Sequence, residues 1–431
     1  MNHTQEDLKR EVDVVGLGAN IINIVVGGGI FALPAVVAAQ LGTASIFAYL
    51  FCGLLVALVM FCFAEVGSKV TVSGGAYAYI HTAFGPYAGF LTSVMFVLST
   101  ISADAAVANA LMAMVGSVNP WFQTAWVKVL FFALFFAGLG AINVRGIKQG
   151  MNLVKLLTII KITSLLVLVA CATGSVNTTY LAIEEIPSLG TIGKVCLVLF
   201  FAFQGAETGL SISGEVKKAN KTIPKAIFLS ITGILVLYIA IQTVSMGVLG
   251  SDLLLHKENP LGQLANQVFG PVGLSIMTAA AAISMFGIVT GEVLSMPRIL
   301  YRAAKDQVLP IPQLASTHPL FKTPYVAIIT YASLGFLFAS LGGFEQLAIF
   351  SSATILLVYL GVSLSVIKLR KMVSDTKGFK APGGLLIPIL AVATIVWVLS
   401  NLTKDEFIAI VALVLGLTIL YLIKKKVSKN K

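Results

Sequence analysis

The sequence predicts an all-α integral membrane protein with twelve transmembrane helices, and three observations support this fold class. Of 431 residues, 58% are hydrophobic and only 11% are charged, against about 45–50% and 25% in an ordinary soluble domain. Twelve apolar stretches are long enough to cross about 30 Å of hydrocarbon. The Lys and Arg residues fall almost entirely on one side of these stretches. We therefore expect one transmembrane domain over residues 1–431 rather than a soluble enzyme.

The apolar stretches follow one another with short polar connections, which indicates a single bundle. In chain order they lie at 14–39, 43–66, 87–115, 125–143, 151–172, 191–213, 226–249, 271–297, 325–342, 346–367, 385–400 and 406–423.

The distribution of cations tests this number of spans. With the N-terminus inside, 24 of the 29 Lys and Arg fall in or beside cytoplasmic segments, four lie outside (Lys128, Lys194, Lys257 and Lys404), and Lys161 lies within a span. One missed helix would exchange the faces of every later loop, so the asymmetry supports twelve spans with both termini cytoplasmic. The net charge of +11 thus indicates topology and contact with the inner leaflet of a plasma or inner membrane, not nucleic-acid binding.

Two spans are interrupted in the middle. The first contains three successive glycines at 27–29, and the sixth has a polar, glycine-bearing break from Gln204 to Gly209. Each opens a group of five spans, and because five is an odd number of crossings, the two groups insert in opposite orientations. We expect inverted repeats at 11–173 and 190–372, then two additional helices at 383–424. Paired breaks of this kind indicate the mid-membrane site of a secondary transporter.

A break in a membrane helix exposes N–H and C=O groups that need partners. The N–H groups at Gly28, Gly29 and Ile30, at the positive end of a half-helix, suit a carboxylate. The carbonyls that end the preceding half-helices, from Val25 to Gly27 and from Phe201 to Phe203, suit an ammonium group. A zwitterion with both groups on one carbon fits this pair. The alternative is that the glycines form a small-residue packing face for a neighbouring helix.

Four motifs resemble those of a known transporter family. VVGGGIFALPA at 25–35 is similar to the first-helix motif of amino acid/polyamine/organocation permeases. FAE at 63–65 with VSGGAYAYIHTAFG at 72–85 resembles the acidic end of helix 2 and the lead into helix 3. FFAFQGAETGLSISGEVKKANKTIPKAI at 200–227 resembles helix 6 and its loop, and PRILYRAAKDQVLP at 297–310 the end of helix 8. The motifs keep the family's order through most of the chain, which makes the resemblance specific.

The resemblance implies a LeuT-type fold with five-plus-five inverted repeats and two C-terminal helices, and alternating-access transport of amino acids or related amines. It also implies that Phe201 takes the place of the family's aromatic gate on helix 6. The substrate-binding residues that we expect are Val25, Val26, Gly27, Gly28, Gly29, Ile30, Asp104, Phe201, Ala202, Phe203, Gln204 and Glu207.

Lys161 lies inside the fifth span. It is about ten residues into the span, so roughly 15 Å of helix rise places it near mid-depth, too deep to snorkel and in a region where charge is usually functional. A lysine that loses and regains a proton during the cycle could couple transport to a proton gradient. The resemblance implies the same, because Lys161 matches a helix-5 lysine that, in proton-coupled and sodium-independent members, stands where other LeuT-type carriers bind sodium. We expect Lys161 to be the coupling cation and no sodium site, in a transporter that is either proton-coupled or an exchanger.

Three acidic residues also fall inside spans. Glu207 either satisfies free N–H groups of the following half-helix or takes part in substrate or proton handling, as the resemblance implies. Asp104 stands where the family's arginine/agmatine branch has a substrate-contacting asparagine. An acid there could favour a cationic substrate, be protonated, or pair with Lys161. Glu292, six residues before Arg298, is expected to pair with basic residues near the cytoplasmic face.

Neither a cofactor nor a metal is expected, and the chain is not expected to be an enzyme. Its four histidines and four cysteines are scattered without metal-ligand spacing, and no HExxH, GxSxG or Walker motif occurs. The expected partners are an amino acid or related amine, protons and the lipid bilayer. Two alternatives stay open: a polyamine or amine exchanger of the same fold, and a channel or non-transporting sensor. A pore would more naturally show a polar stripe along several helices.

Overall fold

A computed structural model describes residues 12–70, 75–145, 151–183, 186–209, 216–309, 311–372 and 379–429. Within these residues the protein is helical, apart from one isolated parallel bridge between Val12 and Val216. The predicted cytoplasmic cations Lys9, Arg10, Lys148, Lys377 and Lys431, and residues 72–74, 210–215 and 310 of the motifs, lie outside the described residues.

The helices follow the apolar stretches. In chain order they are α1 (Val14–Val25), α2 (Gly28–Leu41), η1 (Gly42–Ala44), α3 (Ser45–Lys69), α4 (Gly75–Phe84), α5 (Pro86–Val118), η2 (Pro120–Gln123), α6 (Ala125–Arg145), α7 (Met151–Ala172), η3 (Thr173–Ser175), η4 (Thr178–Leu181), α8 (Leu189–Leu199), η5 (Phe200–Phe203), α9 (Ala206–Gly209), α10 (Ala219–Leu249), η7 (Gly250–Leu255), α11 (Pro260–Ser295), α12 (Pro297–Lys305), η8 (Pro312–Ala315), α13 (Tyr325–Leu341), α14 (Phe344–Met372), α15 (Leu386–Leu399) and α16 (Lys404–Lys429).

Each predicted span overlaps one or more of these helices. In the described part of the chain, eight helical segments are long and apolar enough to cross a bilayer, and four more apolar helices are shorter. The all-helical class is confirmed, while the number of crossings and the inverted repeats stay predictions. Two predicted starts differ by more than two residues: α10 begins at Ala219, seven residues before the predicted 226, and α11 begins at Pro260, eleven residues before the predicted 271. It bends at Gly270, where φ is +72° and the next residue is a proline without an N–H group.

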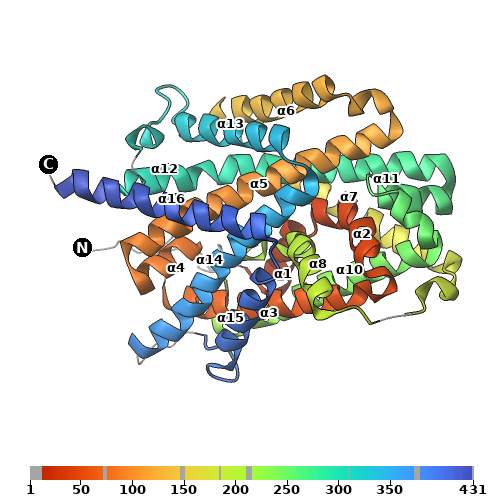
Figure 1. The fold of residues 1–431 in the computed structure, drawn as a ribbon, viewed down its shortest axis with the longest axis horizontal. Coiled ribbons are helices and arrows are strands. Elements are labelled where there is room, and N and C mark those ends of the chain that lie inside the picture. Colours follow the sequence, from red (N-terminus) through yellow and green to blue (C-terminus); the bar gives the residue numbers. More distant parts are fainter. Residues whose placement is uncertain are drawn as a thin grey trace.

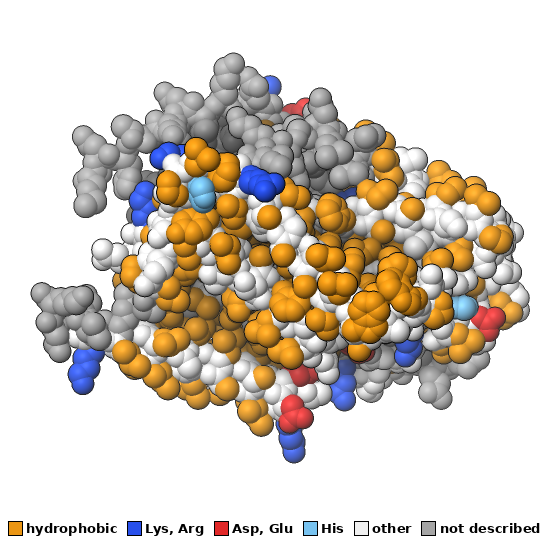
Figure 2. Space-filling view, turned by 90° about the horizontal axis from the view of Figure 1, so that it is seen from above, with side chains coloured by type: hydrophobic (Ala, Val, Ile, Leu, Met, Phe, Trp, Pro, Cys, Tyr) orange, Lys and Arg blue, Asp and Glu red, His pale blue; other side chains and the backbone are white. Residues whose placement is uncertain are grey.

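The helices pack as long rods around the two broken ones. α5, α6, α11 and α13 run along the length of the molecule, and α14 crosses obliquely and packs along α5, while α1 and α8 lie near the centre (Figure 1). Figure 2 shows a face covered by hydrophobic side chains, on which charged side chains stand mostly toward the edges. This distribution is the one expected when lipid surrounds the protein.

A buried ion pair joins α3 to the end of α14. Glu65 is fully buried and accepts hydrogen bonds from Lys69 Nζ at 2.8 Å and from Arg370 Nε at 2.6 Å. A further guanidinium nitrogen of Arg370 binds its second oxygen, which also accepts from the Ala381 N–H group at 2.8 Å. The carboxylate is therefore fully satisfied, and it connects the two helices to the segment that leads into α15.

Candidate functional site

The first helix break lies between α1 and α2. Val26 and Gly27 separate the two helices, and both have non-helical backbone angles. Gly27 occupies the N-cap position of α2, and it has no side chain that could accept from the N–H groups of the first turn. These N–H groups are therefore not satisfied by a cap.

The second break follows α8. The α-helix continues as the 3-10 turn η5, and the backbone becomes extended at Gln204. The chain then turns at Gly205, where φ is +99°, before the short helix α9. Glu207 Oε2 accepts from the Gly205 N–H group at 3.2 Å and from the Tyr359 hydroxyl. The carboxylate thus satisfies a free N–H group of the break, which was the simpler of the two expectations for it.

The two breaks touch each other. A Cβ atom on Gly29 would lie 2.7 Å from Ala202 Cα, so only glycine allows α2 to approach η5 this closely. The hydroxyl of Tyr238, on α10, is within hydrogen-bond distance of two carbonyl oxygens, Val25 O at 3.0 Å and Ala202 O at 2.8 Å. One side chain therefore links both breaks. The sequence pattern did not identify it, because a tyrosine in an apolar span is usually a packing residue.

A cavity of about 60 Å³ lies where the breaks meet, and α5, α11 and α14 complete its wall. The predicted site residues that line it are Val25, Gly27, Gly28, Gly29, Asp104, Phe201, Ala202, Gln204 and Glu207. The other three, Val26, Ile30 and Phe203, are buried in the surrounding core. There the ring of Phe203 packs edge-on against Tyr238, with centroids 5.1 Å apart.

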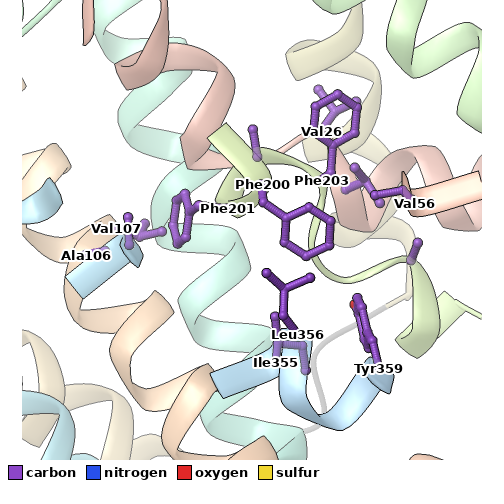
Figure 3. Packing of buried hydrophobic residues seen from close by; sticks show 14 of the residues in the cluster. Val26, Val56, Ala106, Val107, Phe200, Phe201, Phe203, Ile355, Leu356 and Tyr359 are labelled. Atoms are coloured by element: carbon purple, nitrogen blue, oxygen red, sulfur yellow. The ribbon is translucent and has the colours of Figure 1, made fainter. Parts of the chain in front are cut away.

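Phe200 and Phe201 point away from each other. Figure 3 shows the Phe201 ring turned toward Val107 on α5, while Phe200 points toward Leu356 on α14. Phe201 lines the cavity, and its ring centroid is 5.7 Å from that of Phe344. The residue that the resemblance gives as an aromatic gate therefore lies in the cavity wall, and its gating role stays a prediction.

Serines fix Gln204 against α14 and α5. The Gln204 Oε1 atom accepts from Ser351 Oγ at 2.9 Å, and its Nε2 donates to Ser352 Oγ at 3.0 Å. Ser99 Oγ, on α5, donates to the Ser351 carbonyl at 2.9 Å. The polar part of the second break is therefore anchored to two uninterrupted helices, which hold this side of the cavity in place.

Three carboxyl groups line the cavity, and no described residue of its wall is a lysine or an arginine. Asp104 Oδ2 accepts from the Tyr331 hydroxyl at 2.8 Å. The side chain of Glu292 interacts directly with Asp104 and lies near enough to Glu207 for their charges to interact. The expectation that Glu292 pairs with basic residues is wrong, because the packing of α11 places this side chain in the cavity wall beside another acid.

Lys161, on α7, binds to α1. It is 4% exposed, and its Nζ donates to the Asn23 carbonyl at 2.7 Å and lies 3.2 Å from Asn23 Oδ1. Asn23 is in the last turn of α1, whose negative end favours a cation. Pairing with Asp104, one of three expectations, is not seen in the part of the chain that the structure describes.

Comparisons with known proteins identify the family of this chain. Residues 13–423 match the family model for amino acid permeases. The serine/threonine exchanger SteT of Bacillus subtilis (strain 168) is 27% identical, with 98% of this chain and 99% of its own covered. From the same organism, the branched-chain amino acid permease BcaP is 26% identical over 99% of this chain and 95% of its own. A methylthioribose transporter is also 26% identical, over 98% and 95%. These relatives are permeases and transporters, not enzymes.

Proposed function

Because the chain belongs to the amino acid permease family, we propose that this integral, multi-pass membrane protein is a secondary transporter that moves amino acids by alternating access without sodium. One observation carries the proposal: breaks in two apolar helices meet at one cavity. In lipid, irregular backbone is tolerated where it is buried in protein or lines a cavity. Paired half-helix ends at such a place are typical of secondary transporters.

The substrate's α-carboxylate would bind the uncapped N–H groups at Gly28, Gly29 and Ile30. Its α-ammonium would bind the carbonyls that end the first half-helices, including those of Val25 and Ala202. The single O–H of Tyr238 uses at most one lone pair of each of these two carbonyl oxygens, and a carbonyl oxygen has two. Acceptor capacity for an ammonium group therefore remains at both breaks.

Transport by the purified chain in liposomes tests this function. We expect saturable uptake that distinguishes L- from D-amino acids, because a site built from two fixed half-helix ends has one handedness. A flux that rises linearly with concentration, without stereoselectivity, would instead indicate a channel. The absence of any amino acid flux or exchange would favour a non-transporting sensor.

We further infer that Lys161 is the coupling cation and takes the place of a sodium ion. Its bond to the Asn23 carbonyl supports this, because it connects the lysine to the half-helix that ends at the first break. Lys161→Ala should abolish uptake driven by a pH gradient but leave the protein folded, while the exposed Lys194→Ala serves as control. Replacing sodium with choline should not change uptake. Unchanged pH dependence in Lys161→Ala would remove this lysine from the mechanism.

A polyamine or amine exchanger of the same fold is the second candidate. The observation that favours it is the wall of the cavity, where three carboxyl groups occur without a lysine or arginine among the described residues. A substrate without an α-carboxylate would leave the N–H groups of α2 without an anion. Comparison of a diamine with its parent amino acid therefore distinguishes the two candidates.

A further inference from the structure

Asp104 and Glu292 form a carboxyl pair in the cavity wall with unused acceptor capacity. Asp104 comes from α5 and Glu292 from α11, and the two side chains interact directly. The two carboxyl groups hydrogen-bond to each other, which requires that they share a proton, and Asp104 Oδ1 and Glu292 Oε2 accept from no other group among the described residues. A carboxyl oxygen has two lone pairs, so a donor group that enters the cavity can still bind to the pair.

Tyr331 holds this pair in position. Its hydroxyl donates to Asp104 Oδ2, and both side chains are almost completely buried, with Tyr331 at 0% and Asp104 at 1% exposed. The bond fixes one carboxylate oxygen of Asp104, and with it the orientation of the carboxyl group. The pair is therefore an oriented arrangement and not a group of mobile surface acids.

The pair lies about one helical turn from the first break. Cβ atoms built on Gly28 and Gly27 would lie 3.1 Å from Val107 Cγ2 and 2.8 Å from Ile288 Cδ1, so these two residues flank the break. Asp104 is three residues before Val107, and Glu292 is four residues after Ile288, which places each acid on the same helix face as its neighbour. At about 1.5 Å per residue, the offsets are about 4.5 and 6 Å along the helices.

This offset matches the length of a basic side chain. If the α-carboxylate and α-ammonium bind at the breaks, the ammonium of lysine lies five bonds beyond the α-carbon, at about 1.5 Å per bond. It therefore reaches the level of the two carboxyl groups. Two charged carboxylates side by side would repel each other, whereas a pair that shares one proton carries a single negative charge. That charge complements one ammonium group.

We propose that the Asp104–Glu292 pair binds the positively charged end of the substrate's side chain, so that the transporter prefers basic amino acids to neutral ones. This proposal rests on the proposed function, since it places the α-groups at the two breaks. It differs from what the names of the relatives state, which are serine/threonine exchange and branched-chain amino acid transport.

Three probes test this subsite by ligand-induced thermal stabilisation of the purified, full-length chain. They are L-lysine, L-norleucine, which is lysine without its ε-ammonium group, and cadaverine, which is lysine without its α-carboxylate. We expect L-lysine to stabilise the protein at a concentration at least tenfold below that needed for norleucine. Replacing both acids, Asp104→Asn together with Glu292→Gln, keeps the sizes and removes the single charge of the pair, and should abolish this preference. Asp405→Asn, an exposed acid at the start of α16, should keep it.

The outcomes separate this proposal from the function on which it rests. Equal or better stabilisation by norleucine with the wild-type chain overturns the cationic subsite, and this comparison needs no variant to fold. A full lysine preference in the folded double variant overturns the assignment to this pair. Cadaverine that binds as tightly as lysine supports the subsite but favours the amine exchanger over the amino acid transporter.

Discussion

Replacing Gly29 with alanine should force the two helix breaks apart. The added Cβ would lie 2.7 Å from Ala202 Cα and 2.8 Å from its Cβ. Carbon atoms in contact are normally about 3.5–4.0 Å apart, so α2 and η5 must separate by about 1 Å. Ala202 is poorly placed to yield, because Tyr238 holds its carbonyl at 2.8 Å. The clash is with backbone and not with the end of a flexible side chain.

Overpacking of this kind costs about 1–3 kcal/mol, which corresponds to about a 5- to 150-fold change in an equilibrium constant. We expect Gly29→Ala to unfold at a lower temperature. We also expect its affinity for substrate to fall by this factor, because the strain opposes the arrangement in which both breaks face the ligand. Helix propensity alone would favour alanine by about 1 kcal/mol, so backbone preference cannot explain a loss.

The assay is thermal unfolding in detergent together with uptake in liposomes. The matched control is Gly138→Ala on α6, the same substitution at a position with nothing within 4 Å of the new Cβ. If Gly29→Ala equals this control in both stability and uptake, the close contact between the breaks does not exist and the reasoning is refuted.

Three further substitutions test the surrounding structure. Tyr238→Phe removes the hydroxyl that two buried carbonyls share and should lower the free energy of unfolding by about 1–3 kcal/mol; wild-type thermal stability would show that it does not hold the breaks. Glu65→Gln breaks the buried ion pair with Arg370 and should lower the free energy of unfolding by about 3–5 kcal/mol. An unchanged Tm would instead show that solvent reaches the pair. Gly28→Leu should fill the cavity beside Val107 and eliminate substrate binding measured by thermal stabilisation, whereas near-normal affinity would mean that the glycines serve only packing.

The breaks were predictable because their signals are local. Three successive glycines, and a polar step at Gln204 and Gly205, are anomalous inside apolar spans, and the structure interrupts the helices at both places. A lysine near mid-depth is equally anomalous, and Lys161 is indeed buried beside the first break. In each case the cost of the residue in lipid identifies it without knowledge of its neighbours.

The partners of these residues were not predictable in the same way. The expectation for Glu292 was wrong because proximity in sequence to Arg298 does not reveal which face of α11 points inward. Tyr238 and Tyr331 carried no signal, since a tyrosine among apolar residues gives no indication of the polar atom that its hydroxyl meets. These pairings depend on the rotation of one helix against another.

The sequence by itself determined that lipid surrounds this protein, that it is helical, and to which family it belongs. Composition, span length and motif order, on which these conclusions rest, are properties of the chain. It also located the residues that lipid would normally exclude. Only the tertiary structure decided that Gly29 meets Ala202, and that Asp104 faces Glu292 and not Lys161. The physical reason is that contacts between residues far apart in the chain fix which side of each helix points toward its neighbours when helices pack in a membrane.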